Sequence, residues 1–438
     1  MQQVCAAALA VVCILGTVAV RAGEQNAKPA APTFTKDIAP ILYRNCTACH
    51  RPGEIAPMSL LTYEDARPYA KAIRDDVSEG HMPPWHADAA HGTFLNERRL
   101  TGTEKETLLE WANNGAPKGD PKDLPPAPSY VEGWAIGKPD AVFEMAEDYT
   151  VPAEGVIQYE YFYIPTNFTE PKWVQAIEVR PGNRTVVHHV LVYYRAAPDM
   201  QRTNVLQFNP ETARLPAERT AGIRLNAPKP GMPPRRLLAS YAPGTNPQEA
   251  PKGAAFRLEA GGVIELQMHY TTNGEPGTDR TKVGLVFAKE PNPREVRVSQ
   301  FVNGTFTLPA GAPDVAVNAE VGFLQDVTIW GLFPHTHLRG KKWRYELQLP
   351  DGTKKTILDV PRYDFNWQTY YMFRDPLQVP KGAKIVSTAW FDNSTANKWN
   401  PDAKVDVKWG DQTWEEMQYT GILFSPVATP QPAAQEKQ

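Results

Sequence analysis

Two histidines separated by one residue, His335 and His337, follow a stretch with the composition of a β-strand. That stretch, residues 327–332, reads VTIWGL, and β-branched and aromatic residues of this kind are typical of strands. Because residues i and i+2 of a strand point to the same face, the two imidazoles can converge on one ion. Imidazole is a good ligand for copper, zinc, iron or nickel. The spacing therefore predicts a metal site, and the competing interpretation is a pair of surface histidines at a strand end.

Three more histidines lie on stretches with strand-like alternation. His188 and His189 fall in residues 185–195, and His269 falls in residues 263–270. Adjacent histidines on an ideal strand face opposite ways, so a metal shared by His188 and His189 requires a twist, a bulge or the use of different ring nitrogens. His269 taken alone is better explained as a polar residue of a sheet. A second metal site is therefore predicted only if the fold brings the three together.

A different motif stands near the N-terminus, where residues 46–50 read CTACH. C-x-x-C-H is the attachment motif of c-type haem, in which Cys46 and Cys49 bond the two vinyl groups and His50 becomes an axial ligand of the iron. A redox-active dithiol is the alternative. The helix expected over residues 38–44 and the export signal described below both favour haem.

The sixth ligand of such a haem is expected further along the chain. Met82, in the sequence HMPPW, follows a helix predicted over residues 63–78, and the two prolines favour an extended loop. The sequence TEKE at residues 103–106 then predicts the N-cap of a short helix that runs to Trp111. Over residues 33–116 this arrangement resembles small bacterial cytochrome c domains. The competing candidates for the sixth ligand are Met58, His81, His86 and His91.

The first 22 residues have the features of a secretory signal. Residues 4–20 are apolar, and small residues near position 22 permit cleavage after Ala22. The segment lacks the usual Lys or Arg at its start, so a retained membrane anchor is the alternative, although the apolar run is short for a span of ~20 residues. We expect residues 1–22 to be a signal peptide and the protein to be periplasmic or secreted.

Cysteine content limits the metal chemistry. The chain has four cysteines, and Cys5 and Cys13 lie within the expected signal. If Cys46 and Cys49 carry haem, none is left for a structural disulfide in the exported protein. None is left for a blue-copper centre either, because such a centre needs a thiolate. The sequence therefore argues against cupredoxins and multicopper oxidases.

Length and composition indicate several domains. A chain of 438 residues is long enough for about three domains, and its 42 prolines favour short strands and loops over long helices. A formal net charge of −3, without a basic run, argues against nucleic acid as a partner. The expected order is a small all-α domain at residues 33–116, a Pro-rich linker at 117–137, all-β antiparallel sandwiches at 138–292 and 293–426, and a disordered tail at 427–438.

The later motifs, taken in order, resemble a known family. The copper type II, ascorbate-dependent monooxygenases, which include peptidylglycine α-hydroxylating monooxygenase and dopamine β-monooxygenase, carry five histidines and a late methionine in the same order. The similarity covers roughly residues 138–426. The matching stretches are VVHHVL at 186–191, PKGAAF at 251–256, LQMHY at 266–270, HTHL at 335–338 and EEM at 415–417.

The resemblance implies two jelly-roll-like β-sandwiches with one copper ion on each. The resemblance also gives a ligand role to Met417, which would otherwise be interpreted as a core residue. A thioether favours Cu(I), the form that binds dioxygen. The ligand sets that the resemblance implies are His188, His189 and His269 for an electron-transfer copper, and His335, His337 and Met417 for the catalytic copper.

The implied reaction is hydroxylation of a C–H bond of a small organic substrate, with one atom of dioxygen entering the product. Family members take electrons from ascorbate. Because a haem motif shares this chain, we expect the haem to deliver or relay the electrons, with an ascorbate-like reductant or another cytochrome as external donor. One competing interpretation is a non-catalytic copper-binding or electron-transfer protein on the same scaffold. Another is a zinc-stabilised carbohydrate-binding sandwich beside a cytochrome.

Two positions depart from the peptide-amidating members of the family. Those enzymes hold the substrate carboxylate with an Arg two residues before the H-x-H pair and a Tyr four residues after the Met, and this chain has Phe333 and Gly421 there. The departures argue against a peptide C-terminus as substrate. Arg339, close to the histidine pair, is expected to be a solvated loop residue rather than a substrate contact.

Overall fold

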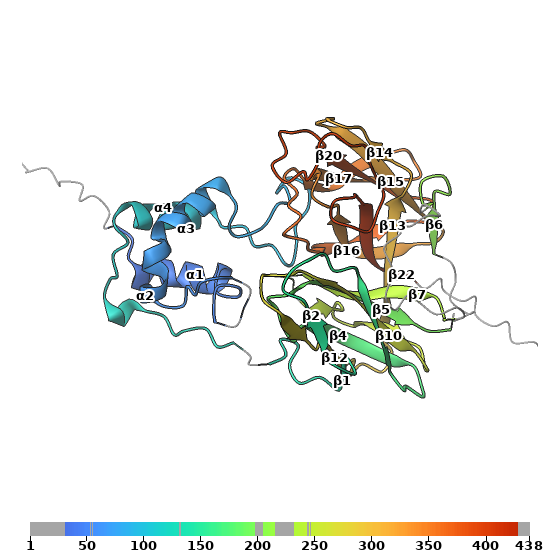
Figure 1. Ribbon diagram of the computed structural model, residues 1–438, viewed down its shortest axis with the longest axis horizontal. Helices are drawn as coiled ribbons and strands as arrows, with labels where there is room; N and C mark the ends of the chain where they lie inside the picture. The colour runs from blue at the N-terminus through green and yellow to red at the C-terminus, as the bar shows by residue number, and fades with distance from the viewer. Residues whose placement is uncertain are drawn as a thin grey trace, which may run out of the picture.

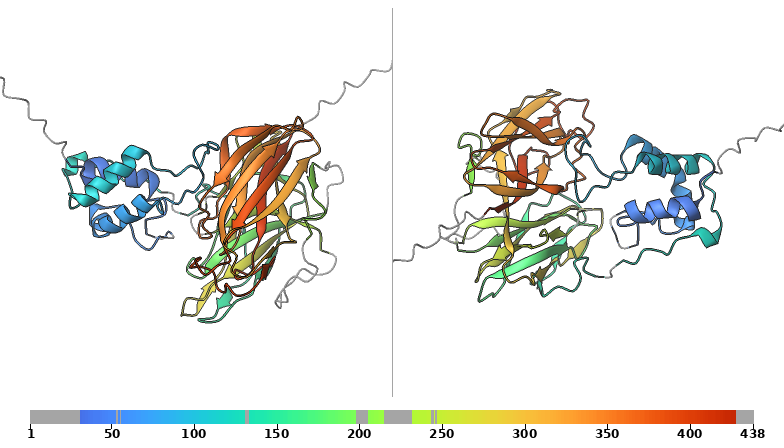
Figure 2. Two further views of the ribbon diagram at one scale, coloured as in Figure 1. Left: turned by 90° about the horizontal axis from the view of Figure 1, so that it is seen from above. Right: turned by 180° about the vertical axis from the view of Figure 1, so that it is seen from behind.

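The computed structural model describes residues 31–427, except residues 53, 55, 131–132, 198–204, 215–231, 243–244 and 246. The expected signal peptide at 1–22 and all but the first residue of the expected tail lie outside these ranges. A small helical region at the N-terminal end is followed by a larger part built from strands (Figure 1). Two other views show the helical region on one side of the β-rich part (Figure 2). Among the residues described, no helix combines the length and apolar character needed to cross a membrane.

The helical region has one small apolar core. Phe34, Leu42, Leu108 and Trp111 are fully buried in it. The expected helix over 63–78 is present in three consecutive pieces. The elements are a π-helical turn (Phe34–Ile38), α1 (Ala39–Asn45), α2 (Tyr63–Ala66), the 3₁₀ turn η2 (Arg67–Tyr69), α3 (Ala70–Glu79), α4 (Gly102–Asn113) and, in the linker, the 3₁₀ turn η3 (Pro121–Asp123).

Helix α4 begins two residues earlier than its sequence suggested. Its N-cap is Thr101, whose hydroxyl accepts a hydrogen bond from the Glu104 N–H at 3.2 Å. The Glu104 carboxylate in turn accepts the Thr101 N–H at 2.8 Å, which completes a capping box. The predicted cap at residue 103 was wrong because Glu104 occupies the third position of this box, so its partner is Thr101.

The β-rich part is organised around one long sheet. Its order is β1-β12-β4-β9-β13-β22-β16-β19, with β8 paired to β4. This sheet supplies one layer to each half of the β-rich part. Its strands are β1 (Ala141–Glu144), β4 (Lys172–Arg180), β8 (Gln248–Glu249), β9 (Ala254–Leu258), β12 (Lys282–Phe287), β13 (Arg294–Asn303), β16 (Val327–His335), β19 (Tyr371–Val379) and β22 (Gln418–Pro426).

Two smaller sheets supply the opposing layers. The four-stranded sheet has the order β3-β10-β5-β7, and the five-stranded sheet has the order β18-β17-β20-β15-β6. The strands of the four-stranded sheet are β3 (Glu160–Pro165), β5 (Val187–Arg195), β7 (Arg235–Tyr241) and β10 (Val263–Tyr270). The strands of the five-stranded sheet are β6 (Leu206–Phe208), β15 (Val315–Phe323), β17 (Gly340–Gln348), β18 (Lys354–Val360) and β20 (Lys384–Phe391). The short pairs are β2 (Tyr149–Val151) with β11 (Gly277–Asp279), and β14 (Thr307–Leu308) with β21 (Val407–Lys408).

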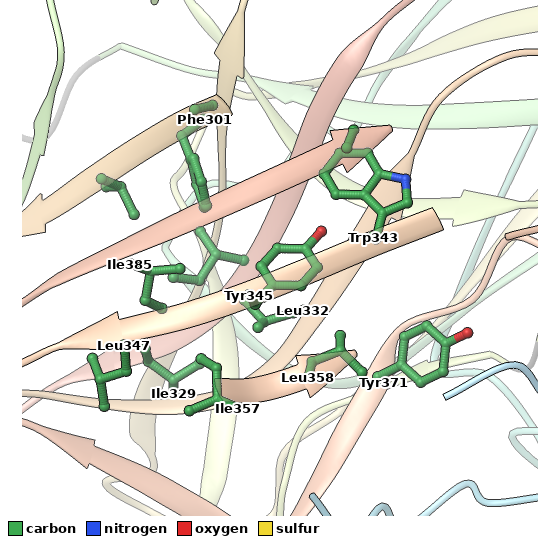
Figure 3. Close-up of a cluster of buried hydrophobic side chains, with 14 of the residues drawn as sticks. Phe301, Ile329, Leu332, Trp343, Tyr345, Leu347, Ile357, Leu358, Tyr371 and Ile385 are labelled. Atoms are coloured by element: carbon green, nitrogen blue, oxygen red, sulfur yellow. The ribbon is translucent and has the colours of Figure 1, made fainter. Parts of the chain in front are cut away.

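Each half encloses its own hydrophobic core, which makes two sandwiches. The first core lies between the four-stranded sheet and the β4–β9–β12 part of the long sheet, with Val174, Val190 and Leu266 at its centre. The second lies between the five-stranded sheet and the β16–β22 part (Figure 3). Alternating strand residues fill both cores, as the period-two pattern of the sequence predicted.

The sandwiches are joined by strand β13. Its residues Arg294–Val296 pair in parallel with β9 of the first sandwich, and Arg297–Asn303 pair antiparallel with β22 of the second. Strand β6 comes from the first half of the chain but pairs with β15 in the second sandwich. The division expected at residues 292 and 293 thus falls immediately before a strand that belongs to both halves.

Part of the expected helical domain lies in the second sandwich instead. Trp85 and Phe94 are buried in the second core. The main chain of residues 93–95 is also bonded there, since the Leu95 N–H donates to Met372 O at 2.8 Å and the Arg374 N–H donates to Thr93 O at 2.9 Å. The stretch between α3 and α4 therefore ties the helical region to the second sandwich.

Candidate metal centres

The first candidate centre is a group of three imidazoles on the four-stranded sheet. His188 and His189 lie on β5, and His269 lies on its neighbour β10. His269 pairs with His189, but the next pair is Tyr270 with Val187, so His188 is an extra residue in a β-bulge. A bulge re-aims side chains, and here it lets two adjacent histidines reach the same point. The bulge therefore explains how two adjacent histidines, which an ideal strand would point to opposite faces, can serve one site.

The ring nitrogens of this three-histidine centre are spaced as ligands of one ion. The Nδ1 atom of His189 lies 3.1 Å from Nδ1 of His188 and 3.3 Å from Nδ1 of His269. Metal–imidazole bonds of about 2.0–2.1 Å in a tetrahedral arrangement place neighbouring nitrogens about 3.3 Å apart. The donor atoms of all three residues lie within 4.8 Å of one another. The geometry fits a metal ion.

Burial keeps these imidazoles in the neutral form that metals bind. It lowers the pKa of His269 to about 3, and the pKa of His189 well below its ordinary value. Neighbouring imidazoles lower both further, and burial also lowers the pKa of His188. A neutral imidazole does not have to lose a proton before it coordinates a metal.

The second candidate centre, the H-x-H centre, begins where β16 ends. His335 is the last residue of β16, and its ring centroid lies 5.1 Å from that of His337. Nδ1 of His335 is 2.6 Å from Oε1 of Gln368, and Nδ1 of His337 is 3.1 Å from the carbonyl oxygen of Glu415. Each Nδ1–H therefore donates to an acceptor in the protein, which leaves Nε2 for a metal. Burial lowers the pKa of His335 to about 4 and the pKa of His337 well below its ordinary value.

Glu416 holds the main chain of this centre, a role that its sequence did not reveal. Its fully buried carboxylate accepts hydrogen bonds from the N–H groups of His337 at 2.8 Å, Arg339 at 2.6 Å and Met417 at 3.3 Å. Burial raises the pKa of Glu416 to about 8, although these N–H donors and the Arg339 charge oppose the shift. One side chain thus fixes the backbone that carries His337 and Met417.

Arg339 is a structural residue, and the expectation that it is solvated was wrong. It is only 1% exposed. Its guanidinium donates to Asn393 Oδ1 at 2.7 Å, to Trp414 O at 2.9 Å and to Asp402 O at 3.3 Å. These acceptors come from loops distant in sequence, so nothing in the local pattern distinguished Arg339 from a surface arginine. It secures the loop after the histidine pair and is not among the residues that line the cavity at His335 and His337.

The two centres share one cavity of about 350 Å³. His189 of the three-histidine centre lines it together with His335, His337 and Met417. This volume lies within the range of ~300–1,000 Å³ usual for small-molecule sites. Met417 shares this wall with both histidines, and its role as a ligand stays a prediction. Much of the remaining wall is aromatic, from Tyr159, Tyr193, Phe208, Phe333, Tyr370 and Tyr419.

A tyrosine hydroxyl takes the space that Gly421 leaves open. A Cβ atom at Gly421 would lie 3.0 Å from Oη of Tyr370 and 3.1 Å from Cβ of Phe333. The Tyr370 hydroxyl is buried and has no hydrogen-bond partner among the described residues. No pattern in the sequence pointed to Tyr370. Its hydroxyl is a polar group without a partner among the described residues, on a largely apolar cavity wall.

A second, larger cavity of about 1,130 Å³ also borders the three-histidine centre. His188 and His269 line it, together with His81 and His86 from the stretch between α3 and α4. Both ring nitrogens of His86 are buried without a hydrogen-bond partner among the described residues, and burial lowers its pKa. His86, a competing candidate for haem ligation, thus faces the same cavity as two residues of the three-histidine centre.

The C-x-x-C-H motif forms a tight turn directly after α1. The N–H groups of Cys49 and His50 both donate to Cys46 O, at 3.1 and 2.9 Å. Both cysteines are free thiols. Burial raises the pKa of Cys46 to about 12 and lowers the pKa of His50, so the imidazole is neutral. Two free thiols and a neutral histidine in one turn fit covalent attachment of a haem.

The structure does not assign the sixth ligand of the predicted haem. The Met82 N–H donates to Asp76 O at 3.2 Å, so this residue stands close to the end of α3. Met58 packs against the helical core, and His81 has an exposed side chain 3.4 Å from the Asp76 carboxylate. Among the contacts of the described residues, none joins the sulfur of Met58 or Met82 to His50. Met82 stays the predicted ligand.

The loop after the C-x-x-C-H motif contacts the sandwich that carries the three-histidine centre. Glu54 accepts a hydrogen bond from Arg51 at 3.0 Å and forms an ion pair with Arg184 at 2.5 Å. Arg184 precedes the first histidine of β5 by four residues. The loop after the motif is thereby held against the segment that leads into the three-histidine centre.

Comparison with known proteins assigns no family. No family model and no curated protein matches the chain. A structure of the Gx strain of infectious bursal disease virus matches with 10% identity over 67% of this chain and 77% of that chain, at a TM-score of 0.17. A Paenibacillus xanthan lyase matches with 9% identity over 73% of this chain and 29% of that chain, also at a TM-score of 0.17. Similarities this low carry no argument about function.

Proposed function

We propose that the protein is a copper-dependent monooxygenase that hydroxylates a C–H bond of a small organic substrate with dioxygen. The observation that carries the proposal is the pair of histidine centres on one cavity of about 350 Å³. The proposal includes two finer assignments of the fold. The helical region is a c-type cytochrome domain, and the sandwiches are jelly-roll-like copper domains.

The residues of the H-x-H centre suit the catalytic copper. Copper bound by His335, His337 and Met417 would supply the reduction of dioxygen, in which a C–H substrate, O₂, two electrons and two protons give the alcohol and water. The chain's own residues prepare the site for this chemistry. Gln368 and the Glu415 carbonyl hold the Nδ1–H groups, so each imidazole presents Nε2. The Glu416 carboxylate keeps the ligand-bearing backbone in place.

The cavity wall indicates the kind of substrate. Aromatic side chains make much of the wall, so they exclude water and favour an apolar molecule. The unpartnered Tyr370 hydroxyl can donate a hydrogen bond to one polar group of that molecule. Phe333 brings no charge to the wall, which is consistent with a substrate that lacks a carboxylate at that end.

The remaining residues suit electron delivery. A haem on Cys46 and Cys49 would supply electrons singly, and copper held by His188, His189 and His269 would pass them on. Burial keeps these three imidazoles neutral, and their ring nitrogens are close enough together to share a metal ion. An ascorbate-like reductant or another cytochrome is the proposed external donor, and a periplasmic or secreted location follows from covalent haem and the expected signal.

A metal count with oxygen uptake tests the proposal. The protein is produced with cytochrome c maturation, loaded with copper, and assayed for copper and haem iron per chain. About two coppers per haem, with oxygen uptake that depends on an apolar substrate, is the expected result. Two coppers without such uptake would favour the non-catalytic electron-transfer protein. No copper beside one haem would refute the monooxygenase.

A further inference from the structure

One loop of the second sandwich touches the helical region and both metal centres. This bridging segment, residues 361–370, connects β18 to β19. At its start, the Arg362 guanidinium donates to the carbonyl oxygens of Glu79 at 3.0 Å and Gly80 at 3.2 Å, where α3 ends. A Cβ atom at Gly80 would lie 2.8 Å from Arg362 Nη2, so glycine allows this approach. Arg362 therefore contacts the helical region two residues before Met82.

The middle of the bridging segment is fixed to the H-x-H centre. The Tyr363 hydroxyl accepts the Thr336 N–H at 3.2 Å and donates to Thr336 O at 2.9 Å. Thr336 is the residue between the two histidines. Near the end of the segment, Gln368 Oε1 accepts the Nδ1–H of His335 at 2.6 Å. The segment thus contacts both the backbone and a ligand of this centre.

The ring of Phe365 lies between the two centres. Its centroid is 5.9 Å from that of His188, and the two rings are tilted by only 27°. The same ring is 5.9 Å from the His337 ring and 6.5 Å from the His335 ring. One side chain therefore contacts a histidine of the three-histidine centre and both histidines of the H-x-H centre.

Local hydrogen bonds hold Phe365 in this position. Asp364 Oδ1 accepts the backbone and side-chain N–H groups of Asn366, both at 2.9 Å, which forms an Asx turn. The Trp367 N–H donates to Asp364 O at 3.0 Å, and the Gln368 side chain donates to Phe365 O at 3.1 Å. The turn restricts the backbone on both sides of the ring.

We propose that the bridging segment couples the helical region to both metal centres, with Phe365 as the positioning residue between the two metals. This inference rests on the proposed function and specifies its electron route. Copper ions held by the two centres would exchange one electron. The ion at the three-histidine centre would go from Cu(I) to Cu(II) as the ion at the H-x-H centre goes from Cu(II) to Cu(I), with no bond or proton exchanged. Phe365 excludes water between the centres and fixes their spacing, while Arg362 fixes the helical region against the segment.

Separate variants test the contact of the segment with the helical region and its contact with the two centres, in the copper-loaded haem protein. Phe365→Leu removes the ring but keeps an apolar side chain, and Phe365→Tyr keeps the ring. Stopped-flow absorbance follows oxidation of the haem, and freeze-quench electron paramagnetic resonance follows the Cu(II) signal of each centre. Phe365→Leu should slow inter-copper transfer about tenfold or more without slowing haem oxidation, by analogy with catalytic sites, where a misplacement of about 1 Å can cost about 100-fold in rate. Phe365→Tyr should restore the rate.

Arg362→Ala should have the opposite effect, with slower haem oxidation and normal inter-copper transfer. Arg344→Ala is the matched control, because Arg344 pairs at the surface with Asp359 in the same sandwich. The inference is overturned if Phe365→Leu retains two coppers and the normal inter-copper rate, and the proposed function survives that result. Wild-type protein without copper at either centre would instead refute the proposed function, and this inference with it.

Discussion

The three-histidine centre and the H-x-H centre both bring imidazoles together but are held in different ways. In the three-histidine centre the main chain does the positioning, because a β-bulge at His188 and the pairing of His189 with His269 bring the rings together. In the H-x-H centre side chains do it, because Gln368 orients His335 and Glu416 holds the backbone of His337. We expect the first centre to resist any single change outside its ligands and the second to depend on its neighbours.

Removal of one ligand from each centre has the largest expected effect. We expect His269→Ala and His337→Ala each to lower copper from about two ions per chain to about one, because each leaves the other ligand set complete. Turnover should fall to background in both, since the proposed function requires one centre for the reaction and the other for electron supply. Copper content and electron paramagnetic resonance measure the outcome. If one substitution removes both coppers, the centres are not the independent sites that the comparison assumes.

Replacement of Glu416 tests the side-chain-held centre specifically. Glu416→Ala leaves the buried N–H groups of His337 and Arg339 without their acceptor, and each such loss costs about 1–3 kcal/mol. The free energy of unfolding should fall accordingly, and copper should bind more weakly at the H-x-H centre alone. Urea denaturation and copper titration measure the two effects.

Glu346→Ala is the control for this change. Glu346 belongs to β17 of the same sandwich, and its carboxylate accepts a hydrogen bond from Gln348, two residues away, and lies 3.7 Å from the ammonium of Lys354. A surface change of this kind should alter stability by less than about 0.5 kcal/mol. Equal losses in Glu416→Ala and Glu346→Ala would contradict the role given to Glu416.

A smaller effect is expected from Gln368→Leu. This change removes the acceptor for the His335 Nδ1–H, and loss of such a partner typically weakens metal affinity about 10–100-fold. Copper affinity of the three-histidine centre should not change. Competition with a chelator, read separately for each centre, measures both affinities. Gln348→Leu in the five-stranded sheet is the matched control, and the prediction fails if the two variants bind copper alike.

Local patterns in the sequence predicted the strands that carry the histidines. The strand expected over residues 263–270 coincides with β10, because its alternating and β-branched residues face a core on one side. The problem of two adjacent histidines on one strand was also visible, and the bulge is one of the solutions anticipated. Local periodicity is sufficient where a single strand decides which way a side chain points.

Contacts between segments that are distant in sequence could not be predicted from local patterns. Glu416 is hydrogen-bonded to His337, 79 residues earlier in the sequence, and Gln368 is hydrogen-bonded to His335, 33 residues earlier. The shared strand β13 and the burial of Trp85 in the second sandwich likewise depend on which segments meet in space. Periodicity gives the face of an element but not its partner, so the sequence pointed to the histidines of the candidate centres but not to the residues that support them.

The smallest expected effect concerns Tyr370, on the cavity wall next to the side-chain-held centre. Its buried hydroxyl has no partner among the described residues, so Tyr370→Phe removes no hydrogen bond within them and should not lower stability. If the hydroxyl donates to the substrate, its loss costs about 0.5–1.5 kcal/mol, and KM should rise about two- to tenfold with little change in kcat. Tyr371→Phe is the control, because the Tyr371 ring packs in the second core rather than on the cavity wall. An unchanged KM in Tyr370→Phe would show that the hydroxyl does not contact the substrate, and the substrate would then be held by the apolar wall alone.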